Sequence, residues 1–151
     1  MTIRPADLAD PRVRQLLHLH LAGLQAITPP DNVYALDLTG LQAPGVTVWT
    51  VWDGETLLGC GALKELDATS GELKSMRTDP RHLRRGVATR LLEYLLALAR
   101  SRGYRRVSLE TGSGEAFEPA LALYRRYGFS NGPAFGDYRA SEFNQFLHLD
   151  L

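Results

Sequence analysis

Several features that mark whole classes of protein are scarce in this sequence of 151 residues. Its one cysteine, Cys60, cannot form an internal disulfide, and such cysteine usage is typical of a reducing compartment. Basic and acidic residues both number 17, so the zero net charge gives no general reason to expect a nucleic acid or an anionic membrane as partner. No apolar run approaches the roughly 20 residues that span a bilayer. Cys60 stands in an apolar strand pattern, which favours a core residue over a catalytic thiol.

The remaining composition is that of one globular domain. Hydrophobic residues make up 44% of the chain and charged residues 23%, which is enough to bury a core and keep an ordinary polar surface. No repeat, low-complexity tract or linker divides the sequence. Residues 1–5 lack the apolar core of a signal peptide. We therefore expect a single cytoplasmic domain over residues 1–151.

Hydrophobic periodicity predicts a mixed α/β chain. We expect strands over 2–4, 46–52, 56–66, 72–78, 106–111 and 143–149, and helices over 11–26, 87–102 and 119–128, with one or two helical turns within 32–41. Period two places Glu72, Lys74 and Met76 on one face of strand 72–78, and the alternate residues from Leu73 to Arg77 on the other. Because a single helix joins strands 72–78 and 106–111, we expect these strands to be parallel neighbours.

The most informative stretch is residues 77–92, where a strand, a basic loop and a helix follow one another. Gly86 has no Cβ, so its backbone can approach a ligand closely. The first amides of the following helix lack intrahelical partners and lie at the positive end of the helix dipole, which favours a phosphate. Arg81, Arg84, Arg85 and Arg90 add positive charge at the same place. A polyphosphate site is one interpretation, and a merely solvated basic helix start is the other.

Known phosphate motifs narrow this choice. The Gly-Lys-Ser/Thr ending of a P-loop and the three spaced glycines of a dinucleotide fingerprint are both absent. Residues 83–88, Leu-Arg-Arg-Gly-Val-Ala, resemble instead the pyrophosphate loop of the Gcn5-related N-acetyltransferases, the GNAT family. The family pattern is Arg or Gln, two residues, Gly, one residue, then Gly or Ala. Leu83 departs from its first position, but the family loop grips pyrophosphate mainly through backbone amides.

A second motif extends this resemblance over nearly the whole chain. Residues 120–129, Ala-Leu-Ala-Leu-Tyr-Arg-Arg-Tyr-Gly-Phe, are similar to the family helix that ends in Gly-Phe. The expected order β-α-α-β-β-β-α-β-α-β-β, in which the strand that follows helix 119–128 has no assigned bounds, is that of the GNAT fold, a mixed sheet whose central parallel pair splays apart for CoA. Stretches 59–64, 71–77, 109–112 and 135–138 resemble a bacterial subgroup of small GNAT proteins, most of which have no assigned acceptor.

The resemblance implies an enzyme that transfers an acetyl group from acetyl-CoA to an amine, with no need of a metal. The strand before the loop would face the pantetheine arm and the acetyl carbonyl through its amides. The implied cofactor-binding residues are Met76, Arg77, Thr78, Leu83, Arg84, Arg85, Gly86, Val87, Ala88, Thr89 and Tyr124. The histidine spacings match no metal motif.

Four residues, two tyrosines and two glutamates, are candidates for the proton transfers that this chemistry needs. Tyr124 matches the family tyrosine that protonates the departing thiolate, and Tyr127 is its rival. Glu72 is the first candidate for the base, and Glu110 is the second. Either carboxylate could instead be a salt-bridge partner, for example of Lys74, and the amine could arrive already deprotonated.

The acceptor is predicted only by class, as a primary amine on a small molecule or a peptide. Candidate residues for binding it are Tyr34, Asp37, Glu72 and Tyr138, and an acidic lining from Asp37, Glu65, Glu72 and Glu110 would favour a cationic amine. Two rival functions stay open. One is an acyl-CoA sensor without turnover, and the other is an interaction protein in which residues 135–138 and strand 143–149 build a homodimer interface.

Overall fold

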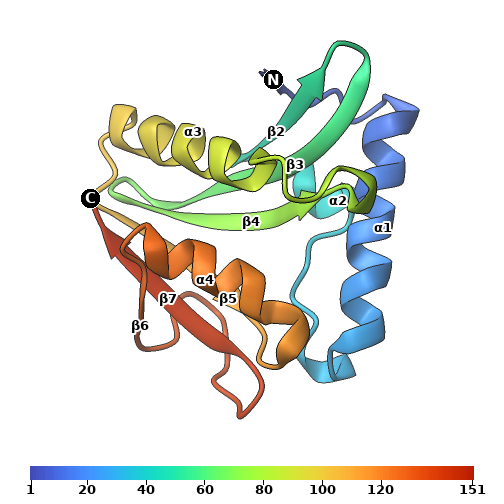
Figure 1. The fold of residues 1–151 in the computed structure, drawn as a ribbon. Helices are drawn as coiled ribbons and strands as arrows, with labels where there is room; N and C mark the ends of the chain where they lie inside the picture. Colours follow the sequence, from blue (N-terminus) through green and yellow to red (C-terminus); the bar gives the residue numbers. More distant parts are fainter.

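The computed structural model describes residues 1–151, whose strands form one seven-stranded sheet of order β1-β2-β3-β4-β5-β7-β6 (Figure 1). The strands are β1 (Thr2–Pro5), β2 (Val46–Asp53), β3 (Thr56–Asp67), β4 (Ser70–Thr78), β5 (Arg106–Thr111), β6 (Ser130–Asn131) and β7 (Gln145–Asp150). The helices are α1 (Pro11–Ile27), α2 (Leu38–Leu41), α3 (Val87–Ser101) and α4 (Glu118–Arg126). This order confirms the predicted sequence of strands and helices. No helix combines the length and the apolar character needed to cross a membrane.

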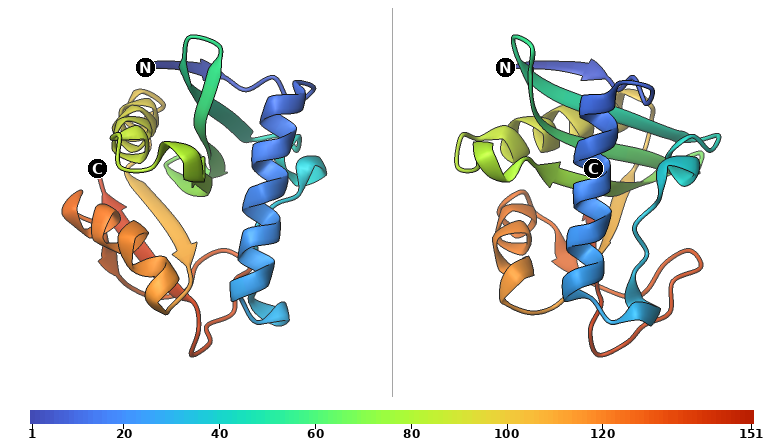
Figure 2. Two further views of the ribbon diagram at one scale, coloured as in Figure 1. Left: turned by 45° about the vertical axis from the view of Figure 1, so that its right-hand side comes forward. Right: turned by 90° about the vertical axis from the view of Figure 1, so that its right-hand side faces the viewer.

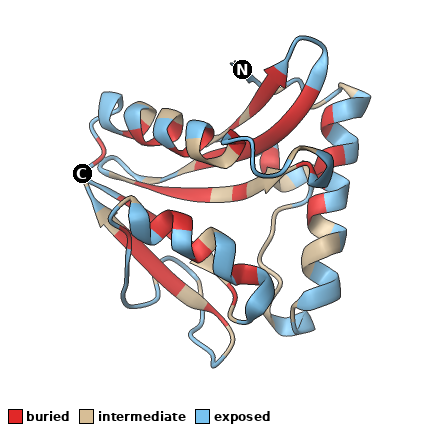
Figure 3. Cartoon of the chain, in the orientation of Figure 1, coloured by how far each residue is buried: buried red, intermediate tan, exposed pale blue.

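Helices cover both faces of the sheet. Figure 2 shows α3 and α4 along one face and α1 on the other. The larger core cluster joins the sheet to α3 and α4, and includes the stripe Leu91, Leu92, Leu95 and Leu96. The smaller cluster packs α1 and α2 against β2 and β3. Buried residues follow the central strands and the sheet-facing sides of α3 and α4 (Figure 3), as the helical periodicity predicted.

A β-bulge interrupts β4 and corrects the predicted alternation of its faces. Between the pairs Cys60–Arg77 and Ala62–Lys74, the register shifts, and Ser75 has a positive φ of 55°. An extra residue of this kind moves every later side chain to the opposite face. Met76 therefore packs with the α3 and α4 core, while Arg77 reaches α1 and donates to the His20 carbonyl. The prediction had placed these two residues the other way round.

The parallel pairing of β4 with β5 is short. The opening beyond it, where the two strands are no longer hydrogen-bonded, positions the site. Pairing covers only Ser70–Glu72 against Arg106–Ser108. Beyond the bulge, β4 keeps its antiparallel partner β3, and β5 keeps β7 up to Thr111. The two strands are thus parallel neighbours, as predicted, but their later residues face each other without a ladder. Such an opening leaves backbone amides and carbonyls available to a ligand.

Some boundaries differ from the prediction for local reasons. The last strand begins at Gln145 rather than residue 143, because Ser141 and Asn144 form a hydrogen-bonded turn just before it. Its side chains alternate between the two faces of the sheet, since Leu147 lies in the α3–α4 core and His148 packs against Phe135 on the other face. Residues 32–41 contain one short helix, α2, which Asp37 caps.

Candidate active site

Four arginines of the β4–α3 loop and the first turn of α3 fall into two groups, those engaged in ion pairs and those without one. Asp79 accepts from Arg81, with Nη2–Oδ2 at 2.8 Å, and Arg85 pairs with Asp53 at 3.3 Å. Neither Arg84 nor Arg90 takes part in an ion pair. Two of the four arginines are therefore available for a phosphate, and two are engaged within the protein.

The backbone of this loop is shaped for an anion. Arg84 and Gly86 both have positive φ values, 61° and 78°. Gly86 is the N-cap of α3 and supplies no side-chain cap, so the first amides of the helix have no protein acceptor at that end. A Cβ at Gly86 would meet no protein atom within 4 Å, so the space beside it is open to a ligand. These features fit a bound pyrophosphate.

A cavity of about 480 Å³ leads from this loop between α3 and α4. We call it the α3–α4 cavity. Its walls are mostly apolar and come from β3, β4, the loop and both helices. The lining residues are Cys60, Met76, Arg77, Thr78, Leu83, Arg84, Val87, Ala88, Leu91, Ala116, Pro119, Ala120, Leu123 and Tyr124.

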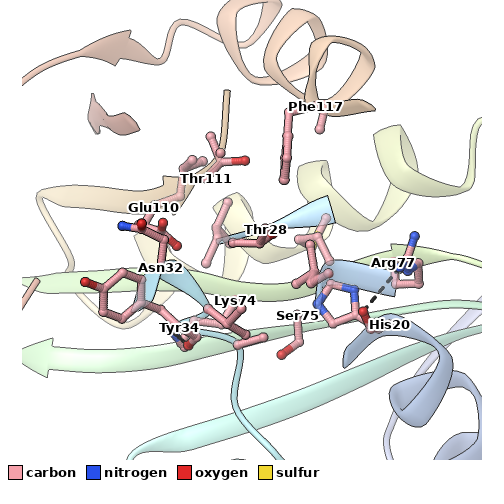
Figure 4. A pocket seen from close by; sticks show the side chains of 18 of the residues that line it. His20, Thr28, Asn32, Tyr34, Lys74, Ser75, Arg77, Glu110, Thr111 and Phe117 are labelled. Atoms are coloured by element: carbon pink, nitrogen blue, oxygen red, sulfur yellow. Dashed lines mark hydrogen bonds between the residues drawn. The ribbon is translucent and has the colours of Figure 1, made fainter. Parts of the chain in front are cut away.

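A second cavity, of about 210 Å³, lies on the other side of the opening between β4 and β5 (Figure 4). We call it the α1-side cavity, because α1 and residues 32–35 form its outer wall. Charged and polar side chains from β4 and β5 line it, among them Glu72, Lys74 and Glu110. The two cavities share the lining residues Met76, Arg77, Ala116, Ala120 and Tyr124.

Tyr124 thus stands where the two cavities meet. Its side chain is 7% exposed and packs edge-on against Phe129. Burial raises the pKa of Tyr124 to about 12, so the hydroxyl keeps its proton at neutral pH. The rival Tyr127 lies outside both cavities and donates to Glu93 of α3 at 2.8 Å. Geometry therefore favours Tyr124 over Tyr127 as a proton donor at the junction.

Glu72 is buried in a complete hydrogen-bond network. Its carboxylate accepts from the Tyr138 hydroxyl and, at 3.2 Å, from the Lys74 ammonium. Lys74 also donates to the Tyr138 hydroxyl at 2.6 Å. Tyr34 packs edge-on against Tyr138, with ring centroids 4.9 Å apart. The fold thus brings together three predicted site residues, Glu72, Tyr34 and Tyr138.

Glu110 lies on the neighbouring strand β5, and unlike Glu72 it is not part of a hydrogen-bond network. Its carboxyl group has no hydrogen bond within the protein and is partly exposed in the α1-side cavity. Burial raises the pKa of Glu110 to about 7; the Lys74 charge opposes this shift, and the Glu72 charge adds to it. A carboxyl group with this pKa can accept a proton near neutral pH.

Comparison with known proteins assigns the family. The model of the acetyltransferase (GNAT) family matches residues 13–129. The chain belongs to the GNAT acetyltransferase family. It is 46% identical over 150 residues to the uncharacterized N-acetyltransferase YedL of Escherichia coli (strain K12), covering 99% of this chain and 94% of YedL. It is 47% identical over 138 residues to the uncharacterized N-acetyltransferase YsnE of Bacillus subtilis (strain 168), covering 91% of each chain.

A solved structure shares the fold of this acetyltransferase. An aminoglycoside 6'-N-acetyltransferase complexed with coenzyme A superposes with a TM-score of 0.76 at 15% identity, covering 99% of this chain and 97% of that one. The GNAT fold and the N-acetyltransferase activity that the sequence resemblance implied are thereby confirmed, while the acceptor is not identified. No observation favours the silent acyl-CoA sensor.

The sequence did not predict that the side chains of three further residues would lie at this site. Arg77, His20 and Ser75 line the α1-side cavity together (Figure 4). The family resemblance had assigned Arg77 a role only through its backbone, by its position on the strand before the loop. The signal that could have revealed it is the pair of glycines Gly59 and Gly61 in β3, since glycine inside a strand often marks a bulge or a close backbone approach.

Two acidic residues predicted to line the acceptor site, Asp37 and Glu65, lie away from both cavities. The Asp37 carboxylate caps α2 by accepting from the Gly40 amide at 2.8 Å, and Glu65 accepts from Tyr104 at 3.2 Å. Of the expected acidic lining, only Glu72 and Glu110 reach the α1-side cavity. Cys60 is buried in the core, and burial raises its pKa to about 12, which agrees with a structural role.

Proposed function

We propose that this chain transfers the acetyl group of acetyl-CoA to a primary amine of a small molecule, in a ternary complex. The uncapped amides of α3 and Arg84 would hold the pyrophosphate, and the α3–α4 cavity would hold the pantetheine arm beside Met76–Thr78. The acceptor would enter from the α1-side cavity. The observation that carries the proposal is the meeting of the two cavities at Tyr124, where β4 and β5 separate.

The chemistry at that junction needs two proton transfers. The amine nitrogen forms a bond to the acetyl carbonyl carbon, the bond from that carbon to sulfur breaks, and the sulfur leaves as a thiolate. Tyr124 would give its proton to this sulfur, and a base would take the proton that the amine loses. Strand amides around Met76–Thr78 would polarise the carbonyl oxygen. Holding both substrates in line would supply much of the acceleration.

We assign the base to Glu110 in preference to Glu72. The carboxylate of Glu72 already accepts from Tyr138 and Lys74, so a proton bound there would compete with two donors. Glu110 has no such donor, and its raised pKa of about 7 suits proton transfer. Glu72 would instead fix Lys74, which lines the acceptor site, with Tyr138 bonded to both residues. An amine that arrives deprotonated would reduce the need for any base.

The size of the α1-side cavity supports a small acceptor over a peptide. At about 210 Å³ it is smaller than the roughly 300–1,000 Å³ typical of sites for drug-sized ligands. Phe135 and Tyr138 pack on Phe146 of their own chain, with centroids 5.9 Å and 5.8 Å away. A homodimer and a cytoplasmic location stay predictions, to be checked by sizing and fractionation.

Calorimetric titration tests the cofactor half of this proposal, and thiol release tests the reaction. Acetyl-CoA and CoA should bind with micromolar affinity, dephospho-CoA and ATP more weakly, and a panel of amines should reveal acceptor-dependent thiol release. Binding without release for any amine would favour the acyl-CoA sensor. No binding of any CoA species would mean that the loop is only a solvated helix start.

A further inference from the structure

Two opposite charges in the α1-side cavity have no partner in the protein. Glu72 and Lys74 neutralise each other. Glu110 and Arg77 do not take part in any ion pair, although both line the cavity. In Figure 4, Glu110 lies toward one end of the cavity and Arg77 toward the other. Burying an unpaired charge is costly, so a matched ligand charge is the usual explanation for keeping one.

The guanidinium of Arg77 is only partly used by the protein. Its Nη2 donates to the His20 carbonyl at 3.3 Å, while its buried Nε has no partner. The guanidinium passes close to Gly23 of α1, where a Cβ would lie 2.4 Å from Nη2. Gly23 therefore leaves room for this side chain. A guanidinium carries several donors in a planar fork, which matches the two oxygens of a carboxylate.

Two further polar groups beside Arg77 lack partners. The His20 side chain and the Ser75 side chain belong to residues that are each only 8% exposed. His20 Nδ1 and Ser75 Oγ make no hydrogen bond within the protein, and both residues line the cavity. Burial and the Arg77 charge lower the pKa of His20 to about 4, so its ring is neutral at physiological pH. Buried polar atoms without partners are rare, so their presence here marks the surroundings of Arg77 as unusual for a protein interior.

We infer that the acceptor is an amino acid, whose carboxylate binds Arg77 while its amine lies toward Glu110. This inference rests on the proposed function and names the acceptor class. The ligand would neutralise both unpaired charges at once. A simple amine would leave Arg77 unpaired, and a simple carboxylic acid would leave Glu110 without a cation and offer no nucleophile.

The position of Arg77 leaves one rival role to separate. Because it lines both cavities, its side chain could contact acetyl-CoA instead of the acceptor. The two roles differ in what the loss of Arg77 does. A contact with acetyl-CoA would weaken cofactor binding and slow every acceptor equally. A contact with the acceptor carboxylate would leave cofactor binding intact and affect only acceptors that carry a carboxylate.

The first experiment compares matched acceptors with the unaltered chain. L-, D- and β-amino acids are assayed by thiol release, each beside its carboxamide and its decarboxylated amine. Loss of the carboxylate should lower kcat/KM by about tenfold to a hundredfold, the range for a hydrogen-bonded charged group. Equal or faster release with the carboxyl-free amines would overturn the inference and leave the proposed function standing. No release with any compound would overturn both.

The second experiment replaces Arg77 by Gln and by Lys. Arg77→Gln should raise KM for the best amino acid at least about tenfold, leave its carboxamide unaffected, and leave acetyl-CoA affinity unchanged. Arg77→Lys should recover part of the loss, because it restores the charge without the fork. Arg106→Gln, which breaks a surface pair with Asp150, is the matched control and should change nothing in this assay. Equal effects on both acceptors, or weaker acetyl-CoA binding, would assign Arg77 to the cofactor.

Discussion

The two cavities are built from different parts of the polypeptide. The α3–α4 cavity and its loop rely on backbone: uncapped amides of α3, positive φ at Gly86, and apolar walls. The α1-side cavity relies on side chains: a closed network around Glu72, and unpaired charges at Glu110 and Arg77. Backbone recognition changes little when single side chains are substituted, which suits a fixed cosubstrate. Side-chain recognition can change by single substitutions, which suits selection of a particular acceptor.

The largest effect is expected at the junction of the two cavities. Tyr124→Phe keeps the ring that packs against Phe129 but removes the proton donor. We expect kcat to fall by about a hundredfold or more, since general acid catalysis contributes roughly 10²–10⁴ in rate. Affinity for acetyl-CoA, measured by calorimetry, should change little. A lower kcat with unchanged affinity would place the proton transfer at the junction of the two cavities rather than within either one.

Tyr127→Phe is the control for this variant. It removes a hydroxyl that contacts only Glu93 on the surface, so kcat should stay within about twofold of the unaltered chain, as surface changes usually have small effects. If Tyr127→Phe were the slower variant, the assignment of Tyr124 would be wrong.

A substitution in the loop should break the backbone side of the comparison. Gly86→Val places a β-branched residue at φ 78° and fills the open space beside the first amides of α3. We expect acetyl-CoA to bind about tenfold to a hundredfold more weakly, because hydrogen bonds to a charged phosphate are lost. Calorimetric titration measures this change directly.

Gly103→Val separates ligand loss from backbone strain. Gly103 has a similar φ of 80° and also faces open space, but it follows the far end of α3. Both variants should lose similar stability, of the order of 1–3 kcal/mol, from a strained backbone. Only Gly86→Val should lose acetyl-CoA affinity. Equal affinities in the two variants would refute the loop assignment.

The sequence predicted the α3–α4 cavity and its loop, which rely on backbone, more completely than the α1-side cavity, which relies on side chains. The glycine, the helix start and the Tyr124 helix are local patterns, so their spacing along the chain predicts their geometry. The bulge at Ser75 is different, because it depends on how β3 and β4 register against each other. That one residue moved the Arg77 side chain into the α1-side cavity. Likewise, no local pattern shows that Tyr138 would meet Glu72, which stands 66 positions earlier.

The two carboxylates of the α1-side cavity should respond differently to neutralisation. Glu110→Gln should lower kcat/KM about tenfold at pH 8, less than general-base catalysis usually contributes, because some amine arrives deprotonated. In the unaltered chain kcat/KM should rise with pH around a midpoint near 7, as Glu110 loses its proton, and the variant should lose this step. Glu72→Gln should instead weaken folding, because it leaves Lys74 buried without its carboxylate. A pH step retained in Glu110→Gln but lost in Glu72→Gln would reverse the two roles.

The smallest effect concerns stability, and it isolates the cost of the unpaired Glu110. Its pKa is about 7 in the folded protein and near 4.5 when solvated, so the folded state binds more protons between these values. Stability therefore falls as pH rises through that window and stays lower above it. Glu110→Gln removes this loss, so its stability relative to the unaltered chain should rise by roughly 1–3 kcal/mol from pH 4 to pH 8. Urea unfolding at the two pH values measures the change. Thr111→Val, at a neighbouring residue that does not titrate, is the control and should change stability equally at pH 4 and pH 8. If Glu110→Gln also changed stability equally at the two pH values, the carboxylate would not be destabilised in the cavity.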